Sequence, residues 1–263
     1  MKMSVSNMAW CADDNIAVYK MMVQYGINGL EILPTKIIAD SPYDHVKDIL
    51  NWKKGEIDSY GFQIPSMQSI WYGQTENIFG TEEEQRKLVM YTKKAIFFAE
   101  AIGCRNLVFG CPKNRVMPQT KRRDDAILFF QEIADVAAEH NVVIGIEANP
   151  PIYQTNFINT TKEAVDLIDV VDRKSFMLNF DFGTFIENGE DLSILKGRVS
   201  QISHVHISEP NLKPIQKREE HKHLCSLLEK EGYEGYVSVE MGAVKDVSVL
   251  DNVLRYVREL VRG

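Results

Sequence analysis

The chain has 263 residues, of which 44% are hydrophobic and 25% are charged, and its formal net charge is −7. This composition is that of an ordinary globular protein with enough apolar material for a sizeable core. The acidic balance argues against sequence-independent binding to nucleic acid, which depends on neutralising phosphates with lysine and arginine. No apolar run approaches the roughly 18 residues that a membrane helix needs, so we expect no membrane association.

The first residues and the cysteines indicate a cytoplasmic protein. The opening segment MKMSVSNMAWCADDN lacks the apolar core of a signal peptide. The four cysteines form no CxxC pair and no zinc-ribbon spacing, so we expect idle thiols in a reducing compartment. The sequence leaves the oligomeric state open and admits a homo-oligomer.

Short apolar runs rich in β-branched residues alternate with longer segments of helical period along the chain. The strand-like runs cover residues 3–10, 29–34, 63–69, 106–112, 142–149, 176–183, 202–210 and 236–242. The clearest helical segments cover residues 16–26, 82–103, 124–141 and 161–172. Eight consecutive βα units predict a parallel sheet closed into a single-domain α/β fold, a (β/α)8 TIM barrel over residues 1–263. A doubly wound sheet is the alternative, but no glycine-rich turn is present to cradle a dinucleotide.

A polar residue ends each of the last four strand-like runs, and these four residues are Glu147, Asp181, His206 and Glu240. In a TIM barrel the carboxyl ends of the strands build the active site, and consecutive strands are neighbours. We therefore expect the four side chains to converge. Three carboxylates at close range repel one another unless a cation binds between them. The pattern predicts one divalent metal ion, with manganese, cobalt, magnesium and zinc all compatible with the ligands.

The remaining histidines have less specific surroundings. His204 shares the strand face of His206, where it fits equally well as a metal ligand or as a core histidine that supports the ligands. His221 and His223 are two residues apart on an expected helix, so they do not face the same way. We expect both of them at the surface.

These residues and their surroundings resemble the xylose isomerase-like TIM barrels, a family that includes sugar phosphate isomerases and epimerases. The likeness spans nearly the whole chain and rests on the segments YGINGLEILP, GIEANP, NFDFGTF, HVHISEP and EGYEGYVSVEMG. The last segment is the most specific, because a Gly-Tyr-x-Gly-Tyr run leading into a strand that ends in glutamate is typical of the family. The resemblance implies that Glu147, Asp181, His206 and Glu240 are the metal ligands. The ketose 3-epimerase branch further implies that Glu147 and Glu240 form the acid/base pair.

The sequence departs from that branch at positions where its members contact the sugar. Thr184 stands where a histidine is expected, Tyr153 where a glutamate is expected, and Leu212 where an arginine is expected. Glu209 keeps the glutamate of the branch and is a candidate substrate contact. The ketose substrate is therefore not carried over.

Other candidate substrate contacts lie near the remaining strand ends. Glu31 and Gln68 close the second and third runs and are expected to face the barrel mouth. Trp10 is placed to stack on a sugar, although a core tryptophan fits the sequence equally well. Lys113 and Arg115 follow the fourth run, in a loop that is suited to a phosphate or carboxylate or is simply solvated.

We therefore expect a divalent-metal-dependent isomerase or epimerase that acts on a small carbohydrate, either a sugar, a sugar phosphate or a polyol, through an enediolate. A metal-dependent lyase that dehydrates an inosose or a dehydroshikimate-type acid is the first alternative, because that reaction also starts from an enolate. Two remoter alternatives are a non-catalytic sugar-binding barrel and an endonuclease IV-like DNA repair enzyme. The latter needs three zinc ions and more histidines at its strand ends.

Overall fold

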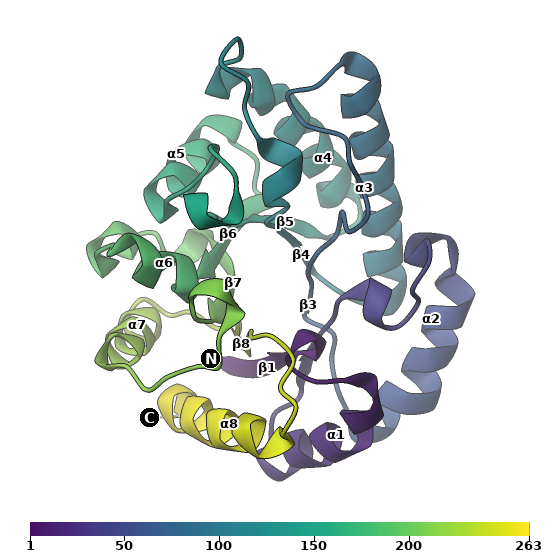
Figure 1. Cartoon of the computed structure of the whole chain (residues 1–263), viewed down its shortest axis with the longest axis vertical. Helices are drawn as coiled ribbons and strands as arrows, with labels where there is room; N and C mark the ends of the chain where they lie inside the picture. The colour runs from purple at the N-terminus through teal and green to yellow at the C-terminus, as the bar shows by residue number, and fades with distance from the viewer. Residues whose placement is uncertain (263) are drawn as a thin grey trace.

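The computed structural model describes residues 1–262, whose strands surround a central axis while the helices form an outer ring (Figure 1). The strands are β1 (Lys2–Ser6), β2 (Gly29–Glu31), β3 (Ser66–Met67), β4 (Asn106–Phe109), β5 (Val143–Ile146), β6 (Phe176–Asp181), β7 (Ile202–Ile207) and β8 (Tyr236–Val239). The helices are α1 (Asn15–Gln24), α2 (Val46–Trp52), α3 (Glu82–Ile102), α4 (Ile127–Glu139), α5 (Thr161–Val171), α6 (Phe182–Asn188), α7 (Glu219–Lys230) and α8 (Val247–Arg262). The order of the elements confirms the predicted (β/α)8 barrel.

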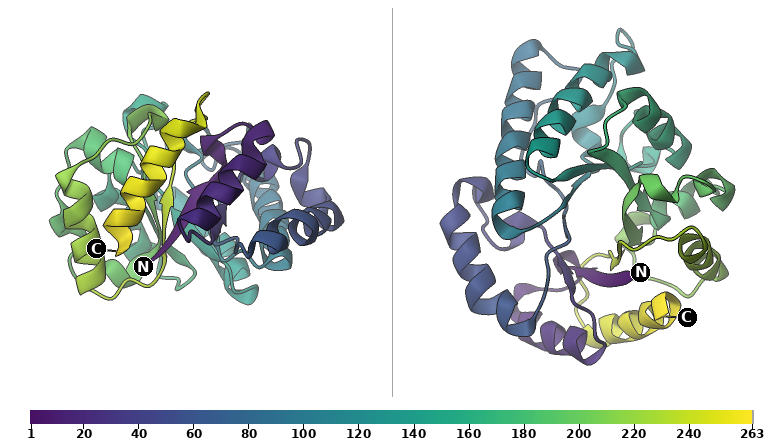
Figure 2. Two further views of the ribbon diagram at one scale, coloured as in Figure 1. Left: turned by 90° about the horizontal axis from the view of Figure 1, so that it is seen from below. Right: turned by 180° about the vertical axis from the view of Figure 1, so that it is seen from behind.

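All strand pairs are parallel, in the order β2-β1-β8-β7-β6-β5-β4-β3. The two outermost strands of this order are β2 and β3, and backbone hydrogen bonds at their carboxyl ends close the sheet into a barrel. Ile32 N donates to Ser66 O (3.1 Å) and Gln68 N donates to Ile32 O (2.9 Å). Because β1 pairs with β8, the first and last strands lie side by side and both chain ends lie near them (Figure 2).

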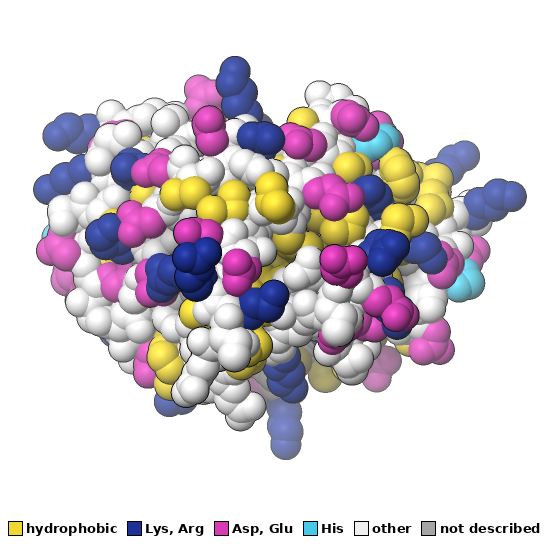
Figure 3. Space-filling model, turned by 90° about the horizontal axis from the view of Figure 1, so that it is seen from above, with side chains coloured by type: hydrophobic (Ala, Val, Ile, Leu, Met, Phe, Trp, Pro, Cys, Tyr) yellow, Lys and Arg dark blue, Asp and Glu magenta, His cyan; other side chains and the backbone are white. Residues whose placement is uncertain are grey.

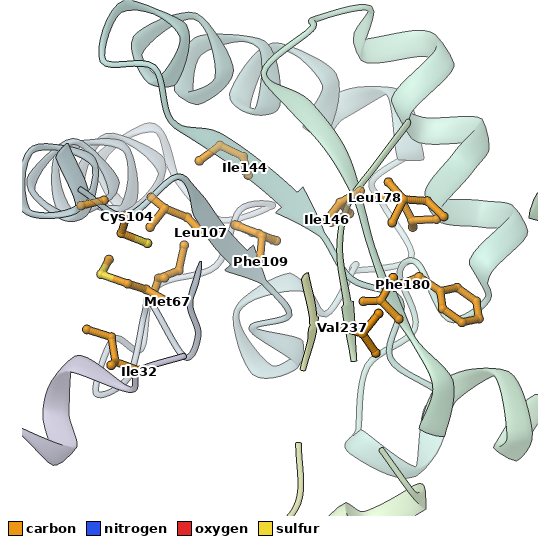
Figure 4. Close-up of a cluster of buried hydrophobic side chains, with 14 of the residues drawn as sticks. Ile32, Met67, Cys104, Leu107, Phe109, Ile144, Ile146, Leu178, Phe180 and Val237 are labelled. Atoms are coloured by element: carbon orange, nitrogen blue, oxygen red, sulfur yellow. The ribbon is translucent and has the colours of Figure 1, made fainter. Parts of the chain in front are cut away.

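The two faces of the sheet differ sharply in polarity. Residues pointing toward the helices are apolar, and Figure 4 shows part of this layer, with Leu107 and Phe109 of β4, Ile144 and Ile146 of β5, and Leu178 and Phe180 of β6. The alternate residues are polar or small and are also buried, among them Ser4, Ser66, Asn106, Asn179, His204 and Ser238. The main hydrophobic core therefore lies between sheet and helices, while the inside of the barrel carries polar groups.

Local signals place the helices as the sequence predicts. Thr81 and Glu84 form a capping box at the start of α3, and Gly103 ends that helix with a φ of 77°. Thr160 caps α5 with the help of Glu163. The short helix α6 was not predicted. It begins directly after β6, with Asp181 both ending the strand and capping the helix, so no loop segment separates the two elements in the sequence.

The surface carries acidic and basic side chains close together, with hydrophobic side chains between them on the face shown in Figure 3. Within residues 1–262, no helix is both long and apolar enough to span a lipid bilayer. The cysteines Cys11, Cys104, Cys111 and Cys225 are all free thiols.

Candidate metal centre

The four predicted ligands come together at the carboxyl ends of β5 to β8. Glu147, Asp181, His206 and Glu240 each offer one ligand atom, and these atoms all lie within 4.8 Å of one another. The three carboxylates line a cavity of about 180 Å³ at the barrel mouth, and His206 lies fully buried beneath them. The predicted convergence is therefore present in the structure.

His206 is the only basic side chain that pairs with these carboxylates within residues 1–262. Its Nδ1 lies 3.0 Å from Glu147 Oε1 and 3.2 Å from Glu240 Oε2. Burial alone would lower the pKa of His206, but the surrounding carboxylates of Glu240, Glu31 and Glu147 raise it well above the usual range. One imidazolium cannot balance three carboxylates, so the cluster remains anionic when all of them are ionised.

Asp181 has two hydrogen-bonding roles besides facing the cluster. Its Oδ1 accepts from Thr184 N (2.6 Å), which caps α6, and its Oδ2 accepts from the Ser208 hydroxyl. Gly183 leaves room for this arrangement, because a Cβ there would lie 3.0 Å from Ser208 Oγ. Burial, reinforced by Glu147, raises the pKa of Asp181.

Side-chain amides hold the two glutamates. Glu147 accepts from Asn179 Nδ2 at Oε1 (2.7 Å) and from Asn149 Nδ2 at Oε2 (3.2 Å). Glu240 accepts from Gln68 Nε2 at Oε1 (3.1 Å). Burial raises the pKa of Glu240 to about 7, although His206 acts in the opposite direction. The two glutamates are thus fixed by different partners and have different electrostatic surroundings.

The donor set fits a divalent cation. The buried carboxylates of Glu147 and Glu240, the half-buried carboxylate of Asp181 and one imidazole provide hard oxygen ligands and one nitrogen ligand, a combination used for manganese, cobalt, magnesium and zinc. The raised pKa of Asp181 and of Glu240 reflects carboxylates that are buried together without an equal number of positive charges. A cation at this point would remove the mutual repulsion.

Comparison with known proteins identifies the fold family. The model of the xylose isomerase-like TIM barrel family matches residues 20–260. The chain belongs to this family. A search of curated proteins found no significant match for the xylose isomerase-like chain.

Solved structures similar to this family member include two epimerases and a dehydratase. The 3-keto-D-glucoside 4-epimerase YcjR from E. coli is 18% identical, with a TM-score of 0.77 over 100% of both chains. The D-psicose 3-epimerase from Clostridium cellulolyticum H10 is 17% identical, with a TM-score of 0.74 over 100% of this chain and 92% of the other. The probable 3-DHS dehydratase AsbF from Bacillus anthracis is 13% identical, with a TM-score of 0.70 over 100% of this chain and 99% of the other. At these identities the likeness establishes the fold alone.

The walls of the cavity combine carboxylates with apolar and amide groups. The lining residues are Met8, Gln68, Ser69, Val108, Gly110, Cys111, Pro112, Glu147, Asn149, Tyr153, Asp181, Ser208, Glu209, Leu212 and Glu240. No lysine or arginine of residues 1–262 is among them. Ser69, Cys111 and Leu212 have φ values of 54°, 43° and 52°, a backbone conformation that is unusual for residues other than glycine and is concentrated at functional sites.

Two mouth loops meet over the cavity at Tyr153. The backbone N–H of Asn211 donates to the Tyr153 hydroxyl (2.9 Å), so the loop after β5 and the loop after β7 are joined. Burial raises the pKa of Tyr153 to about 12, which keeps the hydroxyl protonated at neutral pH. Three residues stand where the ketose 3-epimerase branch has sugar contacts, and they are placed differently in this structure. Tyr153 and Leu212 line the cavity, whereas Thr184 is buried and donates to Ala148 O (2.8 Å).

Of the other candidate contacts, Gln68 and Glu209 line the cavity. Glu209 holds Arg218 in a two-pronged ion pair, with Nε to Oε1 at 2.8 Å and Nη2 to Oε2 at 2.6 Å. Glu31 is not at the mouth. It is fully buried, and it contacts His206 Nε2, the ring nitrogen that faces away from Glu147 and Glu240, as well as the Ser238 hydroxyl.

Trp10, Lys113 and Arg115 do not line the cavity in this structure. Trp10 is fully buried, donates to Asn15 Oδ1 (2.8 Å) and borders a separate cavity. Lys113 is exposed. Arg115 points inward, where its Nη2 donates to Glu147 O (2.9 Å) and to Asn149 Oδ1 (2.5 Å), because its loop folds back over β5.

Asn149 and Ser208 are site residues that the sequence reasoning missed. Each follows a ligand by two positions, Asn149 after Glu147 and Ser208 after His206, and each contacts a ligand carboxylate. The two-residue period of a strand was the signal that could have identified them.

The prediction that His221 lies at the surface is wrong. His221 is buried against Phe182 and contacts the Tyr256 hydroxyl (2.9 Å), whereas His223 is exposed as predicted.

Proposed function

We propose that the protein is a divalent-metal-dependent isomerase or epimerase that acts on an uncharged sugar or sugar-like ketone. Glu147 and Glu240 are the acid/base pair, and Asp181 and His206 complete the metal ligands. The observation that supports this function best is the meeting of all four side chains at one cavity, with ligand atoms within 4.8 Å of one another.

The two glutamates enter the cavity from β5 and β8, with β6 and β7 between them. One carboxylate removes a proton from the carbon beside the substrate carbonyl, and the other returns a proton to the resulting enediolate. Return to the opposite face of the same carbon inverts that centre, whereas return to the neighbouring carbon gives an aldose–ketose isomer. When bound, the divalent ion would supply the electrophile that stabilises negative charge on the substrate oxygens.

The amides prepare both glutamates for this work. Gln68 orients Glu240, while Asn149 and Asn179 orient Glu147, so neither carboxylate needs to rotate before a proton moves. The Tyr153 hydroxyl accepts from Asn211 N and keeps its own proton to donate to a substrate oxygen. The joined loops above the cavity would exclude water from the reacting carbons.

The charges of the cavity support an uncharged substrate. The lining includes the carboxylates of Glu147, Asp181 and Glu240, with Glu209 paired to Arg218, and no lysine or arginine of the described residues, so no basic side chain of the lining would pair with a phosphate or carboxylate. The volume of about 180 Å³ is below the roughly 300–1,000 Å³ of drug-sized ligand sites and suits a compact ligand. The lack of a basic side chain in the lining and the small volume disfavour a sugar phosphate and a dehydroshikimate-type acid.

The test is proton exchange with solvent. The metal-loaded protein is incubated in deuterated water with a panel of uncharged ketoses and keto-glycosides, and deuterium uptake is followed by NMR. We expect uptake at the carbon beside the carbonyl in the wild type and its loss in Glu240→Gln. Undiminished uptake in Glu240→Gln would remove that residue from the acid/base pair, and failure of the wild type to bind a divalent metal would overturn the mechanism.

Product analysis in the same experiment separates the reaction types. Each uncharged sugar is paired with its phosphate ester, and we expect turnover of the uncharged member only. Loss of water from the substrate would instead identify a lyase, which starts from the same enolate. Binding of a sugar without any deuterium uptake would identify a non-catalytic sugar-binding barrel.

A further inference from the structure

Glu31 is a buried carboxylate that takes no part in the proposed proton transfer. It is completely inaccessible to solvent and does not line the mouth cavity. Within residues 1–262 its side-chain contacts are His206 Nε2 at 3.0 Å and His204 Nε2 at 3.4 Å on Oε1, and the Ser238 hydroxyl at 2.7 Å on Oε2. Burying a carboxylate without a lysine or arginine partner is costly, so its position calls for a role.

The contacts of His206 indicate what that role is. Its two ring nitrogens point in different directions: Nδ1 faces Glu147 and Glu240, and Nε2 faces Glu31. An ionised carboxylate only accepts hydrogen bonds, so the contact with Glu31 places a proton on Nε2. In the neutral ring this leaves the lone pair on Nδ1, which is the nitrogen that faces the predicted carboxylate ligands Glu147 and Glu240.

Ser238 fixes Glu31 in turn. Its hydroxyl donates to Oε2, which leaves Oε1 for His206 at 3.0 Å and for the more distant His204 at 3.4 Å. Ser238 lies two residues before Glu240 on β8, so the strand that carries one predicted ligand also holds the support of another. The three side chains form one chain of contacts, from Ser238 through Glu31 to His206.

We propose that Glu31 is a positioning residue of the metal centre: it holds His206 in the Nε2–H tautomer and in the ring orientation that presents Nδ1 to a divalent cation. The inference rests on the proposed function, because it assumes that the cluster binds a metal. Carboxylates that orient metal-bound histidines in this way typically change metal affinity about 10- to 100-fold when they are removed.

The experiment measures Mn²⁺ affinity by calorimetry on the full chain. Glu31→Gln keeps an acceptor but loses the charge, and we expect Mn²⁺ binding about tenfold weaker; Glu31→Leu removes the acceptor, and we expect about 100-fold. Glu100→Gln is the matched control, because Glu100 contacts His140 Nδ1 at 2.8 Å on the surface, and it should bind Mn²⁺ like the wild type. Ser238→Ala should weaken binding in the same direction by a smaller factor, which keeps the proposal testable if a Glu31 variant does not fold.

A second readout is independent of affinity. In the Zn²⁺-loaded wild type, two-dimensional ¹H–¹⁵N spectra of the histidine rings should show a slowly exchanging proton on His206 Nε2, and this proton should exchange faster in Glu31→Leu. Mn²⁺ affinity equal to the wild type in both Glu31 variants would overturn this inference alone. Two bound Mn²⁺ ions per wild-type chain, one of them lost in Glu31→Gln, would also overturn it, because Glu31 would then be a ligand itself. A wild type that binds no Mn²⁺ would overturn the proposed function as well.

Discussion

The two halves of the barrel contribute to the centre in different ways. Strands β5 to β8 provide every predicted ligand, whereas β1 to β4 provide none. The first half nevertheless reaches the centre through Glu31 at the end of β2, Gln68 past β3 and Gly110 past β4, each of which lies against a predicted ligand side chain. The second half presents the predicted ligands, and the first half adds to the support that Asn149, Asn179 and Ser208 give them within the second half.

The strands of the two halves also differ in length. β6 and β7 have six residues each, and Asp181 and His206, near their carboxyl ends, both belong to the cluster. β2 has three residues and β3 has two. Their polar residues lie beside or below the cluster, where they can only contact the ligands from the side or from beneath.

The largest expected effect is the loss of a ligand from the second half. Asp181→Asn removes one of the three charges that attract the cation, so we expect Mn²⁺ affinity to fall by more than about 100-fold, beyond the range of about 10- to 100-fold for a supporting residue. Asp191→Asn is a matched control, because Asp191 also caps a helical turn, accepting from Ser193 N at 2.7 Å, but lies outside the cluster. Calorimetry of both variants measures the difference. Equal affinities would mean that Asp181 serves only as a helix cap.

The next effect is the response of metal binding to pH. Burial raises the pKa of Glu240 to about 7, and only the deprotonated carboxylate binds a cation. Protons therefore compete with the metal below that pH, and we expect Mn²⁺ affinity to fall by about tenfold for each pH unit below about 7. Above that pH this contribution should level off. The slope should be shallower in Glu240→Gln, and identical slopes in the two proteins would contradict the assignment.

The sequence was a good guide to the second half of the barrel. In β5 to β8 each ligand ends an apolar strand, and the two-residue period places Asn179 and His204 on the same face as the ligands. These are local properties of one strand, so they can be read without knowing how strands pack. The family resemblance added the identity of the fold, and the family model covering residues 20–260 agrees with it.

The first half could not be predicted equally well, because the height of a residue in the barrel depends on how its strand is placed relative to its neighbours. Glu31 ends an apolar run just as Glu147 does, but lies beneath the cluster. Arg115 follows β4 but folds inward, and burial lowers its pKa to about 10. His221 was expected at the surface, and it is buried because α7 packs its face against Phe182 and Tyr256. Each of these depends on contacts between distant segments.

A smaller effect should follow from removing a support supplied by the first half. Gln68→Leu takes away the amide that donates to Glu240 Oε1 at 3.1 Å without altering any ligand, so we expect Mn²⁺ affinity to fall by about tenfold. Gln131→Leu is the control, since Gln131 donates to Val171 O (3.1 Å) outside the barrel interior. If Gln68→Leu binds Mn²⁺ as tightly as the control, the amide does not orient Glu240 and β3 contributes nothing to metal binding.

The smallest expected effect tests whether the first half also contributes by leaving space. Gly110 follows β4, and a Cβ at this position would lie 2.8 Å from Glu147 Oε2. In Gly110→Ala the flexible carboxylate can turn aside at a cost of about 1 kcal/mol, which corresponds to an affinity for Mn²⁺ about fivefold weaker, while the fold is retained. Gly55→Ala is the control, because a Cβ there meets nothing within 4 Å. Unchanged Mn²⁺ affinity in Gly110→Ala would show that Glu147 has room to spare. A fivefold loss without loss of thermal stability would show that a residue with no side chain helps to aim a ligand from the neighbouring strand.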